Sequence, residues 1–167
     1  MACKDWHDIP AGPVSWIHVA TTERGQFPNI SVRFLVSLCY HCAKPPCVPA
    51  CPAGAIIKLK ENGVVVVCRE TCLGISSCGG ICQMACPYGL PQFGTEPDAK
   101  MEKCDLCFDR WIEGKKPICV EACPMRALDA APLGELKLKY GSVEQNKVVG
   151  LAFDEVSRPS IVSKAKE

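Results

Sequence analysis

Cysteines dominate the chemistry that this sequence can perform. The chain has 14 cysteines among 167 residues, a proportion near the level at which disulfides or metal centres begin to organise a fold. One pattern, a cysteine, three residues, a cysteine and a proline, occurs three times, beginning at Cys47, Cys82 and Cys119. Two further cysteines precede each copy, so the repeating unit is four thiols followed by a proline.

This spacing is typical of iron–sulfur clusters. A cubane cluster takes one thiolate per iron, and closely spaced cysteines on a tight loop can bind three of its corners. In two-cluster bacterial ferredoxins, the cysteine before the proline binds the other cluster of the pair. Proline fixes φ and lacks an N–H, so it can turn the chain after that cysteine and start a helix. The repeat therefore predicts clusters that join separate parts of the chain.

Disulfides, zinc ligands and reduced structural thiols are the other roles that so many cysteines can have. Disulfides need an oxidising compartment, and the N-terminus "MACKDWHDIPAGP" lacks the basic and apolar segments of a secretory signal. Zinc suits the paired cysteines Cys39/Cys42 and Cys104/Cys107, but a zinc ribbon does not require the Cys-Pro ending. Iron–sulfur binding is the favoured interpretation, and a zinc-binding interaction module is the alternative from another functional class.

The charge balance, the hydropathy and the histidines of the chain argue against three other classes of protein: nucleic-acid-binding, membrane-spanning and catalytic. Lysine and arginine number 19 against 18 aspartates and glutamates, so no basic excess supports nucleic-acid binding. Apolar runs such as "FLVSLCY" are far shorter than the ~20 residues that cross a bilayer, so we expect no direct membrane span. The histidines His7, His18 and His41 have no evident nucleophile or acid–base partner, so we expect no catalytic residues. His41 is interpreted as a packing or hydrogen-bonding residue.

Short elements must position these motifs. "SWIHVA" and "ISVRFLVSL" have the composition of strands, and "AIIKLKENGVVVV" predicts a hairpin that turns at 61–63. Short helices are expected after the prolines Pro52, Pro87 and Pro124. The sequence thus predicts an α+β fold of tandem bacterial ferredoxin-like modules, with short strands and helices organised around [4Fe-4S] clusters. Cluster ligation should supply much of the folding free energy.

Four segments together carry a resemblance to a known family: "ACKDWHDIPAGPVSW", "CYHCAKPPCVPACPAGAI", "ACPYGLPQFG" and "KCDLCFDRWIEGKKPICVEACPMRALD". The chain resembles the iron–sulfur electron-transfer subunit of the anaerobic dimethyl sulfoxide reductase family, nearly from end to end. The resemblance implies one ferredoxin-like module at 38–98, a second at 1–37 plus 99–135, and a tail at 136–167. It also implies a non-catalytic subunit that relays single electrons between a quinol-linked integral membrane anchor and a molybdopterin catalytic subunit.

The family's pairing of motifs implies three complete ligand sets. The first set is Cys39, Cys42, Cys47 and Cys86, the second set is Cys51, Cys72, Cys78 and Cys82, and the third set is Cys3, Cys104, Cys107 and Cys119. Cys123 would belong to an incomplete fourth cluster, whose other ligands would precede Met1. The resemblance therefore implies three [4Fe-4S] clusters, and a fourth if the N-terminus is extended.

The segment "CRETCLGISSCGGICQMACP" departs from the family's pattern. Five residues separate Cys72 from Cys78, where two are usual. The ligand role of Cys78 is therefore open, and Cys68 is either a spare buried thiol or a substitute ligand. If neither reaches the cluster, a three-iron cluster is expected.

The terminal substrate belongs to the catalytic partner, so other functions of the same kind stay open. These are the iron–sulfur subunit of another molybdenum or tungsten enzyme, such as formate dehydrogenase, nitrate reductase or polysulfide reductase, and a stand-alone polyferredoxin. With no export signal of its own, the protein is expected to be peripheral to the cell membrane through its partner subunits. It would be cytoplasmic if the partner is not exported. The polar end "RPSIVSKAKE" is expected to run over a partner or to hang free.

Overall fold

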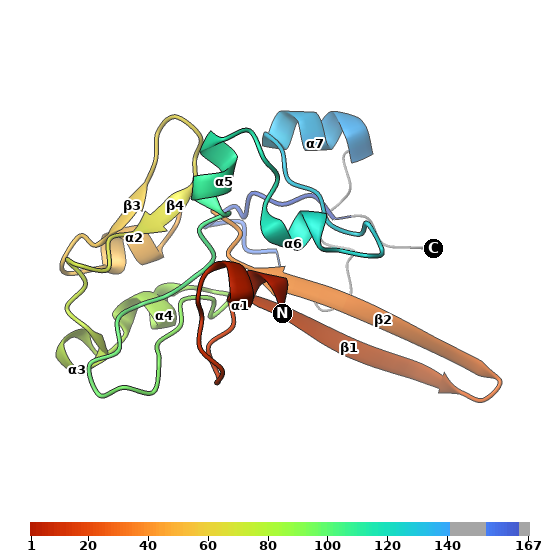
Figure 1. The fold of residues 1–167 in the computed structure, drawn as a ribbon, viewed down its shortest axis with the longest axis horizontal. Helices are drawn as coiled ribbons and strands as arrows, with labels where there is room; N and C mark the ends of the chain where they lie inside the picture. The colour runs from red at the N-terminus through yellow and green to blue at the C-terminus, as the bar shows by residue number, and fades with distance from the viewer. Residues whose placement is uncertain (141–152, 164–167) are drawn as a thin grey trace.

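A computed structural model describes residues 1–140 and 153–163 of the chain. Its elements are short, apart from one hairpin, and occur in the following order (Figure 1): α1 (Ala2–Trp6), β1 (Ile17–Gln26), β2 (Asn29–Leu38), α2 (Cys47–Ala50), β3 (Ile56–Lys58), β4 (Val65–Val67), α3 (Ile75–Cys78), α4 (Ile81–Ala85), α5 (Phe108–Ile112), α6 (Ile118–Glu121) and α7 (Leu133–Tyr140). No helix within these described ranges has the length and apolar character that crossing a membrane requires.

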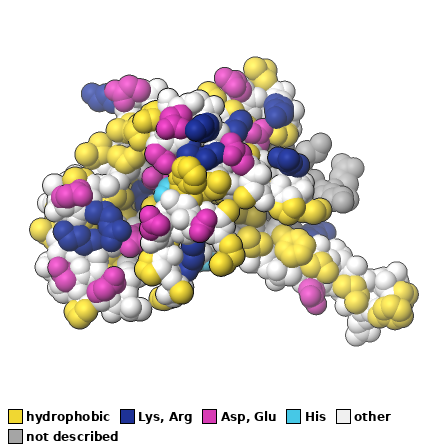
Figure 2. Space-filling model, in the orientation of Figure 1, with side chains coloured by type: hydrophobic (Ala, Val, Ile, Leu, Met, Phe, Trp, Pro, Cys, Tyr) yellow, Lys and Arg dark blue, Asp and Glu magenta, His cyan; other side chains and the backbone are white. Residues whose placement is uncertain are grey.

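Strands β1 and β2 form an antiparallel hairpin that projects from the body of the molecule (Figure 1). The two expected strands are therefore consecutive arms of one hairpin. Apolar side chains of this hairpin stay in solvent, including Val19, which is 59 % exposed, and Phe34, which is 68 % exposed. Figure 2 shows this row of hydrophobic side chains along the hairpin. An exposed apolar row of this kind is typical of a surface that meets a partner.

The expected turn at 61–63 is present between β3 and β4, which pair antiparallel. The Asn62 Oδ1 atom accepts the backbone N–H of Val64 at 3.0 Å, and Gly63 takes a positive φ of 74°. This turn directs Ile56 and Val65 inward, where both are almost fully buried against Met101. The small sheet thereby contributes one side of the hydrophobic core, which includes Cys47 and Cys82.

The helices lie before the Cys-Pro pairs, and the prediction that they follow the prolines was wrong. Helices α2, α4 and α6 occupy the three-residue spacers, and the chain turns after each of them. The cause is local, because a residue that precedes proline is pushed out of the helical region. Cys51 and Cys86 accordingly have extended ψ values of 113° and 116°.

A repeated turn follows each Cys-Pro pair. The carbonyl oxygens of Cys51, Cys86 and Cys123 accept the backbone N–H groups of Gly54, Gly89 and Arg126 at 3.0–3.2 Å. The three turns end in residues with φ of 61°, 60° and 51°. The sequence repeat is thus a structural repeat, in which Arg126 adopts a left-handed conformation that glycine takes in the other two copies.

Residues 153–163 pack on the body, although the polar end was expected to hang free or to cover a partner. The N–H groups of Ala43 and Lys44 donate to the carbonyls of Arg158 and Ser157 at 2.8 and 2.9 Å, and Ser160 donates to Tyr40 at 3.0 Å. These bonds cover the loop that carries Cys42. Residues 141–152 and 164–167 of the expected tail lie outside the described residues.

Candidate metal centres

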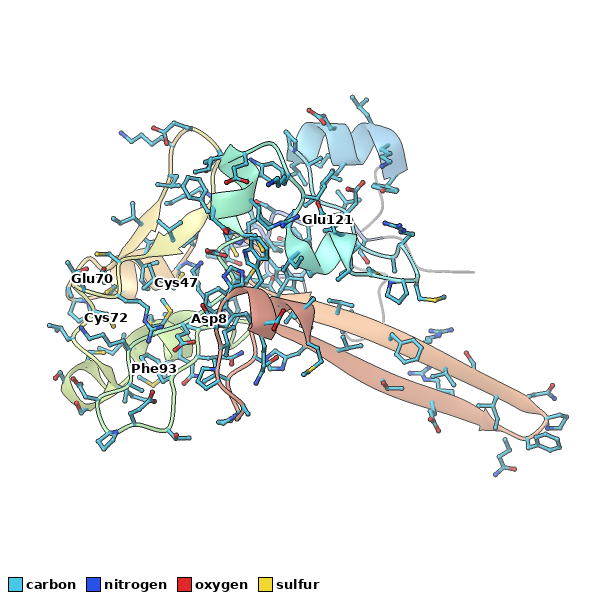
Figure 3. All side chains as sticks on the ribbon, viewed as in Figure 1. Asp8, Cys47, Glu70, Cys72, Phe93 and Glu121 are labelled. Carbon is cyan, nitrogen blue, oxygen red and sulfur yellow. The ribbon has the colours of Figure 1, made fainter. Side chains whose placement is uncertain are left out.

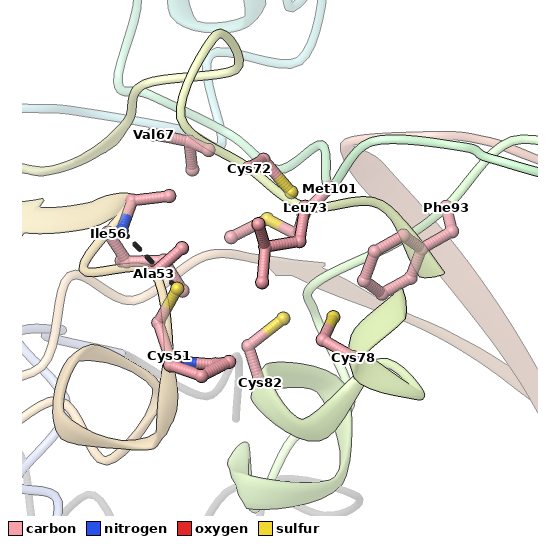
Figure 4. A pocket seen from close by; sticks show the side chains of 12 residues that line it. Cys51, Ala53, Ile56, Val67, Cys72, Leu73, Cys78, Cys82, Phe93 and Met101 are labelled. Atoms are coloured by element: carbon pink, nitrogen blue, oxygen red, sulfur yellow. Dashed lines mark hydrogen bonds between the residues drawn. The ribbon is translucent and has the colours of Figure 1, made fainter. Parts of the chain in front are cut away.

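The four cysteines of the second set line one cavity. Cys51 follows α2, Cys72 lies in the loop after β4, Cys78 ends α3 and Cys82 lies within α4. Figure 4 shows their sulfur atoms pointing into the same space. Among the described residues, the other side chains that line this cavity are apolar, with no histidine and no charged group. Such a pocket can bind a metal centre only through thiol ligands.

Two glycines place Cys78 in this cavity despite the longer spacing. Gly79 and Gly80 have φ values of 64° and 67°, and these left-handed residues separate α3 from α4. A Cβ atom on Gly80 would lie 3.3 Å from the ring of Phe93, which lines the cavity. The double turn therefore lets Cys78 and Cys82 face the same space from two different helices.

Cys68 does not line that cavity. Its Sγ donates to the Glu70 Oε2 atom at 3.3 Å, and its side chain is only half-buried. Figure 3 shows Glu70 beside Cys72 at the left edge of the molecule. Of the two candidates that the sequence left open, Cys78 is therefore the one that reaches the other three thiols.

The four cysteines of the first set, Cys39, Cys42, Cys47 and Cys86, line a second cavity. Its wall includes the rings of Tyr40 and Tyr88, which meet edge to face with centroids 4.8 Å apart. Burial raises the pKa of Cys47 to about 12. At neutral pH, the metal-free thiol therefore keeps its proton, and a metal must displace that proton in order to bind.

In the third set, Cys3, Cys107 and Cys119 lie near one another, whereas Cys104 lies toward the first set. Helix α1 packs on α6, which places Cys3 near Cys107 and Cys119. Burial, and then repulsion from Cys119, raises the pKa of Cys3 to about 11. Burial raises the pKa of Cys104 well above its usual value, and Cys39 of the first set is close enough to add to that effect. Cys104 thus lies on the side of the third set that faces the first set.

His7 is a neighbour of the third set that the sequence analysis missed. Its Nε2 atom lies 3.3 Å from the Cys107 sulfur, and its ring packs at a tilt of 37° against that of Trp16, with centroids 4.5 Å apart. No spacing rule links a histidine near the N-terminus to a cysteine 100 residues later. Only the packing of α1 on the later motif brings them together.

Cys123 lies apart from both cavities. Its sulfur accepts the backbone N–H of Ala127 at 3.4 Å. This hydrogen bond stabilises the thiolate and lowers the pKa of Cys123 below its usual value. Cys51 has the equivalent bond from Ala55 at 3.3 Å, so the repeat extends to the N–H···S contact of the cysteine that precedes proline.

The spacing of the thiols distinguishes between the candidate metals. All 14 cysteines are free thiols, without disulfides. Sulfurs bound to one tetrahedral zinc ion lie about 3.8 Å apart, given a Zn–S distance of about 2.3 Å. Within residues 1–140 and 153–163, however, no three cysteine sulfurs lie within 4.8 Å of one another, and the one group of ligand atoms that close is His7, Asp105 and Cys107. The wider sets fit a larger inorganic core with several irons.

Comparison with known proteins agrees with this fit. The sequence model of the family described as "4Fe-4S dicluster domain" matches residues 30–132. The B subunit of anaerobic dimethyl sulfoxide reductase from Escherichia coli K12 is 41% identical over 98% of this sequence and 80% of its own length. The corresponding Haemophilus influenzae protein is 38% identical with the same coverage. The B subunit of sulfite dehydrogenase from Allochromatium vinosum is 38% identical over 75% of this sequence and 59% of its own length.

These matches confirm the expected ferredoxin-like fold class and the type of cofactor, the 4Fe-4S cluster. They also confirm the resemblance on which the ligand sets were drawn. The protein therefore belongs to the 4Fe-4S dicluster family and, within it, to the iron–sulfur electron-transfer subunits represented by the B subunit of anaerobic dimethyl sulfoxide reductase.

Proposed function

We propose that this protein is a non-catalytic subunit that relays single electrons between a quinol-linked integral membrane anchor and a molybdopterin catalytic subunit. The observation that carries the proposal is the convergence of four thiols from distant segments in each of two neighbouring cavities. The clusters supply the one-electron chemistry when bound. The protein's own residues bind them, exclude water from them and fix their separation.

The two cavities are linked by two short helices. Cys47 and Cys51 lie at opposite ends of α2 and line different cavities, and so do Cys82 and Cys86 of α4. Four residues of helix rise only about 6 Å, so centres held in these cavities would be close neighbours. Because α2 also packs on α4, their separation would be fixed by the fold.

We assign the ligands as follows. Cys39, Cys42, Cys47 and Cys86 hold one cluster, Cys51, Cys72, Cys78 and Cys82 hold a second, and Cys3, Cys104, Cys107 and Cys119 hold a third. Within these 167 residues Cys123 completes no set. We further propose that 38–98 forms one ferredoxin-like module around the first two clusters, and that 1–37 plus 99–135 forms another around the third.

The names of the relatives and the exposed apolar side chains of the β1–β2 hairpin both support binding to partner subunits. The relatives are subunits of reductases by name, and apolar side chains of the β1–β2 hairpin are exposed. Binding to the membrane anchor would place the protein peripherally at the membrane. A sulfite dehydrogenase subunit is also among the relatives, so a complex that passes electrons in the opposite direction is the second candidate.

Anaerobic purification of the protein together with its molybdopterin partner tests the function. The protein should be brown and hold about 12 irons and 12 acid-labile sulfides per chain, four of each for every cubane cluster. Dithionite should bleach its broad absorbance, and dimethyl sulfoxide should restore the colour only when the molybdopterin subunit is present. Colourless protein that contains zinc would reject the proposal, whereas reoxidation by another substrate would favour a related reductase.

Alkylation of the holo-protein tests the ligand assignment at single residues. Cys123 and Cys68 should react with iodoacetamide at neutral pH, because neither belongs to a proposed set. Cys123 should react faster, since its lowered pKa gives more thiolate. Peptide mapping by mass spectrometry under anaerobic conditions measures both rates. A cysteine of the three sets that is labelled as quickly as Cys123 would lose its assignment as a ligand.

A further inference from the structure

Lys103 is a buried cation beside the first set. Its side chain lines the cavity that Cys39, Cys42, Cys47 and Cys86 share, and the residue is 3 % exposed. Its Nζ atom donates to the carbonyl oxygens of Val65 and Cys104. None of the ion pairs found in the described part of the chain includes Lys103. An ammonium group without a carboxylate partner is costly in a protein interior, so its retention calls for a function.

Lys103 also lies toward the third set. It is the residue before Cys104, whose carbonyl accepts its Nζ–H at 2.9 Å. Burial raises the pKa of Cys104 well above its usual value, and the charge of Lys103 opposes that effect. For Cys47, burial again dominates and Lys103 again opposes it. One ammonium group is therefore within electrostatic reach of thiols from two different sets.

His41 and Lys103 both bond to the backbone of Val65. The Val65 N–H donates to the Nδ1 atom of His41 at 2.9 Å, while the Val65 carbonyl accepts from Lys103. Because Nδ1 accepts this hydrogen bond, the single N–H proton of the neutral imidazole must be on Nε2. That buried Nε2 has no hydrogen-bond partner among the residues that the structure describes. A buried donor without a partner is rare enough in native proteins to require an explanation.

We infer, on the basis of the proposed electron-transfer function, that Lys103 and His41 form a buried polar bridge that sets the reduction potentials of the clusters at the first and third sets. Reduction adds one electron to a cluster that is already anionic with its thiolates. A nearby fixed positive charge, such as that of Lys103 at the wall of the first cavity, favours that reduced state. The backbone of Val65 holds both side chains in place, His41 through its N–H and Lys103 through its carbonyl, so the charge of Lys103 stays fixed beside the clusters.

Replacing Lys103 by methionine tests the bridge. The Lys103→Met holo-protein should keep its iron, while the clusters at the first and third sets become harder to reduce. We expect the equilibrium constant for their reduction to fall at least tenfold, which corresponds to about 59 mV for a one-electron couple. The cluster at the second set, whose cavity Lys103 does not line, should change much less. Redox titration followed by electron paramagnetic resonance resolves the separate signals.

Two matched variants complete the test. Lys103→Arg keeps the charge and should keep the potentials near those of the unaltered protein. Lys60→Met removes an exposed lysine from the β3–β4 turn and should leave the potentials unchanged.

Unchanged potentials in Lys103→Met, or equal shifts at all clusters, would overturn the inference while leaving the relay itself intact. If Lys103→Met and Lys103→Gln both fail to assemble while Lys103→Arg assembles, the role is structural and the inference is rejected. Loss of redox activity in the unaltered protein would instead overturn the proposed function.

Discussion

Replacing Cys82 by alanine is expected to remove the cluster of the second set. Iron per chain should fall from about 12 to about 8, since one cubane is lost. Cys82 is 6 % exposed and lies on α4 between apolar neighbours, so no solvent molecule or nearby side chain has ready access to replace its thiolate. Iron and acid-labile sulfide analysis of anaerobically prepared protein measures the loss.

Cys68→Ala is the matched control for this experiment. Its sulfur donates to the Glu70 carboxylate outside the cavity, so iron content and the spectrum of the reduced protein should stay unchanged. Cys78→Ala should have an intermediate effect, because Cys78 is only half-buried at the end of α3, so the three remaining thiols should keep a three-iron cluster with its own electron paramagnetic resonance signal. If Cys68→Ala lost iron and Cys78→Ala kept it, the ligand assignment at the second set would be reversed.

The cysteine spacing indicated units of four thiols and a proline, and the family resemblance grouped them into ligand sets, whose role as ligands stays a proposal. In α2 and α4, a helix of four or five residues separates a thiol near its start from the Cys-Pro thiol that follows its end, and the Cys-x-x-x-Cys-Pro spacing marks both in the sequence. The hairpin of β3 and β4 was also predictable from the sequence, since Asn62 and Gly63 are residues that such turns favour. Local rules of this kind carry over directly from sequence to structure.

Other features depended on contacts that no local pattern records. Helices were placed after the prolines because proline favours the first helical turn, but the restriction on the residue before proline decided the outcome. The role of Gly79 and Gly80 in turning Cys78 inward became clear only from their left-handed backbone. Lys103 resembles any surface lysine in the sequence, and its burial depends on packing against Val65, 38 residues earlier.

Removal of iron is expected to unfold most of the protein. The core residues Ile56, Val65 and Met101 pack directly against Cys47 and Cys82, so the ligands are themselves part of the hydrophobic core. Figure 3 shows Cys47 among short helices and strands. Helices of four or five residues and two-stranded sheets have little independent stability in water.

Treatment with a strong iron chelator under reducing conditions should therefore abolish the far-ultraviolet circular dichroism of the folded protein and expose 38–98 to rapid hydrogen exchange. Structural metal sites commonly contribute about 10 kcal/mol or more to folding, which exceeds the stability that so small a core can supply alone. Addition of iron and sulfide under reducing conditions should restore both signals, whereas zinc alone should not restore the native spectrum, because one zinc ion draws four sulfurs closer together than they lie in the folded protein. A chelated protein that kept its circular dichroism and its exchange protection would show that side-chain packing, and not ligation, holds this fold together.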